Sequence, residues 1–282
     1  FKRCGIFADW ENPYLTLDPR YEASIVKVFG ELAEKGYLFR KKKPVYWCAS
    51  CETALADAEV EYADHSSDSI FVKFAVIELC DVLKNKPVLK DYSVLIWTTT
   101  PWTLPSNVAL AFSPVARYAA CEFLIDNNKI EKLIVAKDLA ENVKSKINAS
   151  SFQIKDEFSG SDLEYIKCKN PIVDRASLGI LADFVSMEDG TGIVHIAPGH
   201  GQEDYQAGLA YKLEIISPLN DRGQFTNQVP EFEGINVFKA NPLIIEKLKA
   251  EGKVLASLSI SHSYPHCWRC KKPVIFRATP QW

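Results

Sequence analysis

The chain lacks the features that mark a membrane-bound or secreted protein. None of its apolar runs approaches the roughly 18 to 20 residues that a membrane span needs, and no cationic, apolar leader opens the sequence. Methionine is scarce too: Met187 is the single methionine, and the first residue is Phe1. We therefore expect a soluble piece excised from a longer protein, without a membrane partner, in the cytoplasm or an organellar matrix.

A strong excess of either charge is also missing. The formal net charge is −3, which argues against an autonomous, high-affinity nucleic-acid binder, because phosphate neutralisation needs clustered cations. Short basic clusters occur only at residues 40–43 and 269–272, each close to a cysteine pair. They can equally be solvated surface charge, so any contact with RNA should be local.

Cysteine, in contrast, is abundant. The chain has 8 cysteines, and without a secretory signal a paired spacing indicates metal more often than a disulfide. Cys48/Cys51 and Cys267/Cys270 form two C-x-x-C units, which suit tetrahedral zinc. The entropic cost of closing a loop grows only logarithmically with its length, so a large domain inserted between the two C-x-x-C units is reasonable. With four protein ligands such a zinc is structural. Free thiols or a redox pair are the alternatives, although no thioredoxin-like βαβ pattern surrounds either unit.

The pattern along the chain is rich in short strands. We predict strands at residues 43–47, 59–62, 70–76, 93–98, 116–125, 132–136, 181–185 and 192–197, a strand-like stretch between residues 252 and 267, and helices between residues 18 and 36 and at 138–147, 203–211 and 242–251. Residues 152–166 are ambiguous. Many short strands with few helices between them favour a closed or strongly curved sheet over a parallel α/β sheet.

Two segments carry candidate chemistry. The first, residues 96–107, is a strand that runs into a proline-stiffened stretch with the hydroxyls of Thr98, Thr99, Thr100 and Thr103, beside Trp102 and Asn107. Such a loop suits binding of ribose, phosphate and a polar leaving group. The simpler explanation is that threonine is a good strand former beside a buried tryptophan.

The second segment, residues 190–205, places His195 at the end of an apolar strand. A glycine-rich turn with Gly199 and His200 follows, and Asp204 opens a helix. A lone histidine on an apolar strand is more often a satisfied core residue, yet here a carboxylate follows a turn that can fold back into the same cleft. An acid in a concave site is a natural anchor for an α-ammonium group. No serine or cysteine nucleophile with an adjacent base is apparent.

These two segments, in this order between two C-x-x-C halves, resemble the editing domain of isoleucyl-tRNA synthetases over essentially the whole chain. The resemblance implies a mixed α+β fold: a β-barrel-centred editing domain with peripheral helices at residues 66–260, a zinc-ribbon-like stem at 45–65 and 261–282, and a helical lead-in at 1–44. It also implies an aminoacyl-tRNA deacylase that hydrolyses misacylated Val-tRNA(Ile). The partners would be the acceptor end of tRNA(Ile), the valine or isoleucine moiety, and the rest of the synthetase.

By this resemblance, Asp204 holds the amino group of the misacylated residue and His195 helps to exclude isoleucine. Water cuts the ester, with help from the ribose hydroxyl of the substrate. The candidate catalytic residues are Asp204, His195 and Thr100, and the candidate substrate-binding residues are Thr98, Thr99, Trp102, Thr103, Asn107, Gly199 and His200.

The signatures of amino-acid activation are absent. The chain has neither a His-Ile-Gly-His nor a Lys-Met-Ser-Lys-Ser motif, and no nucleotide-binding βαβ unit opens it. ATP-dependent ligation of isoleucine would therefore belong to the parent enzyme. The alternative function is a non-catalytic, tRNA-binding or structural insert whose main feature is the cysteine staple.

Overall fold

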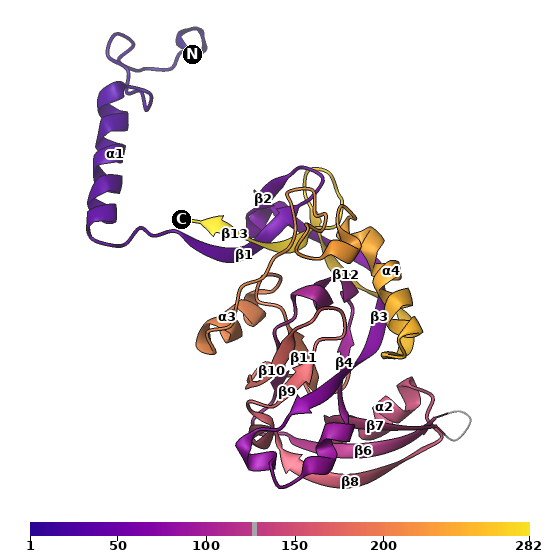
Figure 1. The fold of residues 1–282 in the computed structure, drawn as a ribbon. Helices are drawn as coiled ribbons and strands as arrows, with labels where there is room; N and C mark the ends of the chain where they lie inside the picture. Colours follow the sequence, from indigo (N-terminus) through magenta and orange to yellow (C-terminus); the bar gives the residue numbers. More distant parts are fainter. Residues whose placement is uncertain (126–128) are drawn as a thin grey trace. The chain divides into compact units, whose positions relative to one another are not determined.

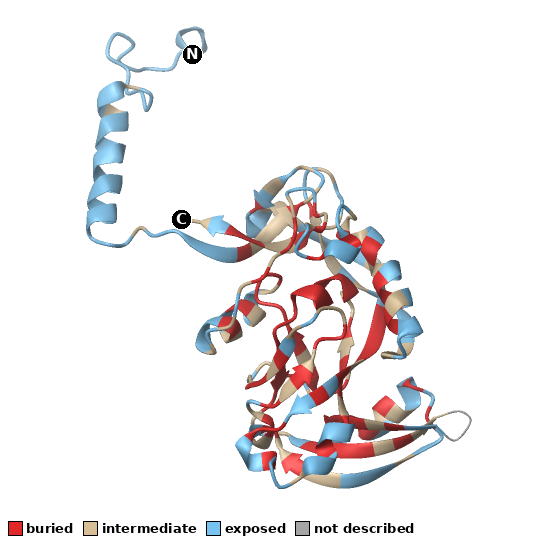
Figure 2. Ribbon diagram, viewed as in Figure 1, coloured by how far each residue is buried: buried red, intermediate tan, exposed pale blue. Residues whose placement is uncertain are grey.

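A computed structural model describes residues 1–125 and 129–282 as two compact units, residues 1–42 with 280–282 and residues 43–279 (Figure 1). The first unit contains helix α1 (Pro19–Glu34), which begins where the Asp18 side chain accepts a hydrogen bond from the Arg20 amide at 2.8 Å. The predicted helix is confirmed, and its apolar residues are largely exposed, Ile25 by 58% (Figure 2). No helix in the described parts of the chain has the length and apolarity to cross a membrane.

The remaining elements are mostly strands. They are β1 (Lys41–Cys48), β2 (Thr53–Leu55), β3 (Val60–Glu78), β4 (Ser93–Thr98), β5 (Ala109–Phe112), β6 (Arg117–Ile125), β7 (Lys129–Ala136), β8 (Ser151–Ser159), β9 (Lys167–Lys169), β10 (Ala176–Leu181), β11 (Ile193–Ile196), β12 (Val254–Cys267) and β13 (Ile275–Gln281). The helices are α2 (Ala140–Lys146), α3 (Gln202–Ala210) and α4 (Val237–Ala250). The mixed α+β class is thus confirmed.

The described strands form an open sheet, so the barrel is not closed. The large sheet has the order β11-β5-β10-β9-β3-β4-β7-β6-β8, with β12 paired to β3 off this path. The long strand β3 changes partners along its length. Its first part pairs with β12, its middle also with β4, and its end with β9. A separate three-stranded sheet, in the order β13-β1-β2, forms the stem.

Two elements, β10 and α4, begin five residues before the predicted strand and helix. The strand expected at residues 181–185 lies earlier, as β10, because Gly179 lets this strand approach the Leu163 carbonyl oxygen, which an added Cβ would meet at 2.4 Å. Helix α4 begins before Pro242, since the Asn236 side chain accepts a hydrogen bond from the Phe238 amide at 3.2 Å and caps the helix there. Proline marked a helix start in the sequence, but here it lies inside the helix.

The core of the second unit surrounds the segments that carry the candidate residues. A 3-10 helix, η5 (Pro101–Ser106), follows β4, and all of its residues are buried. It leads into β5, which pairs antiparallel with β11 so that Leu110 lies opposite His195. The turn after β11 leads into α3. Because β4, β5 and β11 are buried in the sheet (Figure 2), the segments at their ends are held on rigid supports.

Candidate functional site

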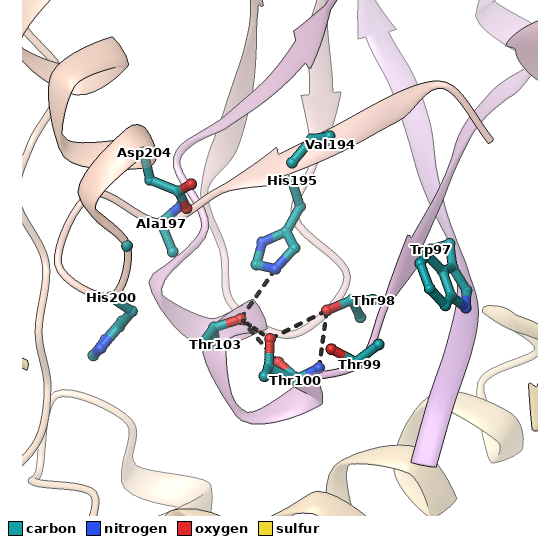
Figure 3. Close-up of a pocket in the computed structure, with 11 residues that line it drawn as sticks. Trp97, Thr98, Thr99, Thr100, Thr103, Val194, His195, Ala197, His200 and Asp204 are labelled. Atoms are coloured by element: carbon teal, nitrogen blue, oxygen red, sulfur yellow. Dashed lines mark hydrogen bonds between the residues drawn. The ribbon is translucent and has the colours of Figure 1, made fainter. Parts of the chain in front are cut away.

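A cavity of about 350 Å³ lies where β4, η5, β11 and α3 meet (Figure 3). Its lining residues are Trp97, Thr98, Thr99, Thr100, Thr103, Val194, His195, Ala197, His200, Gly201 and Asp204. The fold therefore brings the two candidate segments, almost 100 residues apart in sequence, into the walls of one cavity. Seven of the ten candidate catalytic and substrate-binding residues are among them.

Three hydroxyl residues at and after the start of η5 form what we call the hydroxyl stripe: Thr100, which caps the helix, Thr103 and Ser106. Side chains three residues apart eclipse one another on a 3-10 helix, so Thr103 and Ser106 lie on one side of it. Thr100 Oγ1 lies 3.5 Å from Thr103 Oγ1 and 3.4 Å from Thr98 Oγ1. Since prolines stiffen the backbone of this helix, the stripe is a preformed polar wall.

His195 meets the stripe through Thr103. The Thr103 hydroxyl donates to the Thr100 carbonyl oxygen at 2.8 Å, so it can only accept from His195 Nε2, 3.0 Å away. Burial lowers the pKa of His195 to about 4, which keeps the ring neutral at pH 7. A neutral ring with its proton on Nε2 leaves Nδ1 as an acceptor. Within the described structure, His195 Nδ1 is buried without a hydrogen-bond partner.

His200 has the opposite arrangement. Its Nδ1 lies 2.9 Å from the Phe276 carbonyl oxygen, which only accepts, so the proton is on Nδ1. Nε2 then accepts from the Ser106 hydroxyl at 3.0 Å. Burial lowers the pKa of His200 to about 4 as well. Both ring nitrogens are thus used inside the protein, and the ring packs edge-on against Trp102 with centroids 4.9 Å apart.

Asp204 supplies the negative charge of the cavity. It lies in the first turn of α3, where its Oδ2 accepts the Ala197 amide proton at 2.8 Å. Burial raises the pKa of Asp204 to about 6, although that hydrogen bond opposes the shift. Both histidines are neutral at pH 7, so among the described residues that line the cavity Asp204 is the only one ionised. Of the groups a cavity could hold, a single cation complements this charge best.

Three candidate residues do not line the cavity. Trp102 is 3% exposed, and its backbone amide donates to Asn241 Oδ1 at 2.9 Å. Asn107 is fully buried, with its side chain bonded to the Ala109 carbonyl oxygen and the Ser177 hydroxyl. A Cβ on Gly199 would lie 2.0 Å from the Ile216 carbonyl oxygen. Their contacts support the cavity walls from behind.

The cavity also uses residues that sequence reasoning missed. Trp97, Val194, Ala197 and Gly201 line it, and Ser106 anchors His200. The three-residue spacing of the hydroxyls was the available signal for Ser106. Gly201 contributes by its lack of a side chain. A Cβ there would lie 3.0 Å from Asp204 Cγ, so glycine leaves room for the carboxylate.

The four paired cysteines come together in the stem. One sulfur from each of Cys48, Cys51, Cys267 and Cys270 lies within 4.8 Å of the others, and no disulfide links them. A zinc ion with Zn–S bonds of about 2.3 Å needs sulfur separations of about 3.8 Å. Each C-x-x-C turn is followed by a residue with positive φ, Glu52 at 52° and Lys271 at 59°. This cysteine cluster can hold a metal ion, and none of its members lines the cavity.

The chain belongs to the class I tRNA synthetases, because the model of that family (I, L, M and V) matches residues 1–282. Its fold is that of a synthetase editing domain. The crystal structure of the P.knowlesi cytosolic leucyl-tRNA synthetase editing domain superposes with a TM-score of 0.51 at 13% identity, over 71% of this chain and 98% of that one.

Within this class the chain is similar to isoleucine–tRNA ligases. It is 50% identical to the enzyme of Thermoanaerobacter sp. (strain X514) and 49% identical to that of Moorella thermoacetica, in each case over 100% of its own length. The chain spans 30% and 29% of these two relatives. It therefore corresponds to a part of these relatives, and its fold identifies that part as their editing region.

Proposed function

We propose that this chain hydrolyses the ester bond of misacylated Val-tRNA(Ile). The observation that carries the proposal is that Asp204, the one ionised side chain among the described residues of the cavity, shares the cavity with the hydroxyls of the threonines (Figure 3). An aminoacyl ester offers the matching groups, because an α-ammonium lies beside the ester and a ribose hydroxyl next to it. The parent enzyme would ligate isoleucine to tRNA(Ile) with ATP.

In this proposal Asp204 binds the α-ammonium group and fixes the position of the ester carbonyl. A charge-assisted hydrogen bond to a partly buried carboxylate is stronger than a neutral one. The hydroxyls of Thr98, Thr99 and Thr100 hold the terminal ribose and the oxyanion that develops when water attacks. Thr99 suits a substrate contact, because its hydroxyl has no hydrogen-bond partner in the described structure.

Water is the nucleophile. Its attack on the ester carbonyl forms the new C–O bond, the ribose oxygen leaves with a proton, and free valine and tRNA result. The ribose hydroxyl beside the ester is the proposed helper for proton movement. His195 forms the wall that isoleucine would meet, because its ring is fixed by Thr103 and cannot turn away without breaking that hydrogen bond.

The test compares deacylation of Val-tRNA(Ile) and Ile-tRNA(Ile) by this chain. Asp204→Asn keeps the size of the side chain but removes the charge, and we expect a loss of about 100-fold or more in kcat/KM, as for a lost charge-assisted bond of about 3 kcal/mol. The matched control is Glu203→Gln, which removes a charge from the preceding, exposed position outside the cavity. Full activity of the Asp204→Asn variant would contradict the proposal. Binding of tRNA without turnover by the unmodified chain would favour the non-catalytic insert.

We further propose that the cysteine cluster binds one structural zinc ion. Four thiolates complete a tetrahedral shell, so the ion would join the halves of the stem and have no position open to substrate. Metal analysis of the purified chain should find one zinc per molecule, and Cys51→Ser should lower that content. A chain that folds and edits without metal would refute the assignment.

A further inference from the structure

His200 connects the cavity to the stem. We propose that it is a positioning residue: it transmits the position of strand β13, and through it the state of the cysteine cluster, to the hydroxyl stripe. His195 and Asp204 are the residues that would meet substrate, whereas both nitrogens of His200 are bonded to the protein itself.

The stem side of this connection is short and tightly packed. Val274 lies four residues after Cys270, is 1% exposed, and packs with Cys48 and Cys267 around the cysteine cluster. The next residue, Ile275, is 2% exposed and belongs to the main core of the sheet. The carbonyl of Phe276, which accepts the His200 proton, comes immediately after. Between Cys270 and Val274 the backbone is bonded to the same turn, because the Lys271 amide donates to the Cys267 carbonyl oxygen at 2.8 Å and the Val274 amide donates to that of Pro265 at 3.0 Å. A shift of the cluster would therefore be passed on to the Phe276 carbonyl and His200.

The cavity side is equally rigid. His200 accepts from Ser106 at the end of the hydroxyl stripe and packs edge-on against Trp102 in the same 3-10 helix. The Trp102 amide is held in turn by Asn241 of α4. Loss of the His200 bonds would leave Ser106 and the Phe276 carbonyl oxygen without these partners in a buried place, which favours a local rearrangement. The threonines that line the cavity belong to this helix and to the residues before it.

The connection predicts that removing the metal loosens the cavity although no cysteine touches it. Hydrogen exchange of the zinc-loaded and chelator-treated chain measures this without any substrate. The reporter amides are Thr103, which donates to the Thr100 carbonyl oxygen, and Asn107, which donates to that of Leu104. We expect their exchange to speed up about tenfold on metal removal, the factor that corresponds to one lost net hydrogen bond. The hairpin of β6 and β7 should not change and reports that the domain is folded.

Two variants of His200 each remove one of its two hydrogen bonds and keep the other. His200→Asn can place its amide nitrogen where Nδ1 lies and keep the bond to Phe276, whereas His200→Gln can reach Ser106 instead. Each retains one bond, so both should fold, but the reporter amides should already exchange fast and should no longer respond to the metal. The matched control is His262→Asn, since His262 lies on β12 and bonds Ser67, away from the cavity.

The kinetic measurement rests on the proposed function, whereas the exchange measurement does not. The His200 variants should lower kcat for deacylation about tenfold with KM nearly unchanged, because the ammonium contact of Asp204 is kept. Reporter amides that ignore metal removal in the unmodified chain would overturn the proposal. So would a response that persists in both His200 variants. If exchange behaves as expected but no deacylation occurs, the positioning role stands and the proposed function fails.

Discussion

The ionised carboxylate of Asp204 should destabilise the folded protein when no substrate is bound. The size of this destabilisation, its cost in free energy of unfolding, should depend on pH. Burial raises the pKa of its carboxyl from 3.8 to about 6, so the folded chain binds this proton more tightly than the unfolded chain does. The cost is absent well below pH 3.8, grows as the pH rises from 3.8 to 6, and is constant above 6. Replacing Asp204 with asparagine removes a charge that the fold disfavours.

The magnitude follows from the two pKa values. Each unit of difference corresponds to about 1.4 kcal/mol, so ionised Asp204 costs up to about 3 kcal/mol at pH 7.5 and about 1 kcal/mol at pH 4.5. These are upper bounds, because the side chain is only partly buried and water screens its charge. The Asp204→Asn variant should therefore be more stable than the unmodified chain by about 1 to 3 kcal/mol at pH 7.5. It should gain clearly less at pH 4.5.

Urea denaturation of both proteins at the two pH values measures this difference. The slope of free energy against urea should be the same for both, so that the midpoints report stability alone. Glu203→Gln serves as the control, since this neighbouring acid is exposed and its charge raises the Asp204 pKa less than burial does, so its removal should change stability far less. The reasoning is refuted if Asp204→Asn changes stability equally at both pH values, or if it destabilises the chain at pH 7.5.

Three other changes test different parts of the structure. Deacylation of Val-tRNA(Ile) should rise between pH 5 and 7 with an apparent pKa of about 6, because Asp204 must be ionised to bind an ammonium group; a flat profile would argue against that contact. Thr103→Val should lower stability by about 1 to 3 kcal/mol in urea denaturation, since His195 Nε2 loses its acceptor, whereas Thr103→Ser should lose little. Gly199→Ala should lower the free energy of unfolding by about 2 kcal/mol or more, because the added Cβ meets the Ile216 carbonyl oxygen. Gly30→Ala, in the open interior of α1, should instead stabilise that helix by up to about 1 kcal/mol. Similar effects of the two glycine changes would contradict the packing around Gly199.

The sequence was most informative where spacing alone decides the geometry. Two C-x-x-C units predict a four-sulfur cluster wherever the chain brings them together, and β3 pairs with β12 so that Val60 lies opposite Cys267. Alternating apolar runs predicted most strands of the sheet. Local patterns could not show that residues 59–62 and 70–76 belong to one 19-residue strand. That continuity depends on β12, which comes almost 200 residues later.

The role of Asn107 illustrates why part of the site could not be predicted. In the sequence it follows four threonines and a serine, so it looks like one more polar group of the same loop. In the fold its side chain turns toward β10, where the Ser177 hydroxyl donates to Asn107 Oδ1. Arg175 also reaches the Asn107 carbonyl oxygen at 3.2 Å. Partners so distant in sequence leave no local pattern.

The two histidines show what separates a residue that meets substrate from one that supports it. Both are buried and neutral, both bond a hydroxyl of η5, and both line the cavity. Only His195 keeps a buried acceptor without a partner in the described structure. Burying an unpaired acceptor costs about 1 to 3 kcal/mol, and a ligand that donates a hydrogen bond removes that cost. His195 Nδ1 and the Asp204 carboxylate therefore favour the same ligand, one that brings a positive charge and a hydrogen-bond donor into the cavity together.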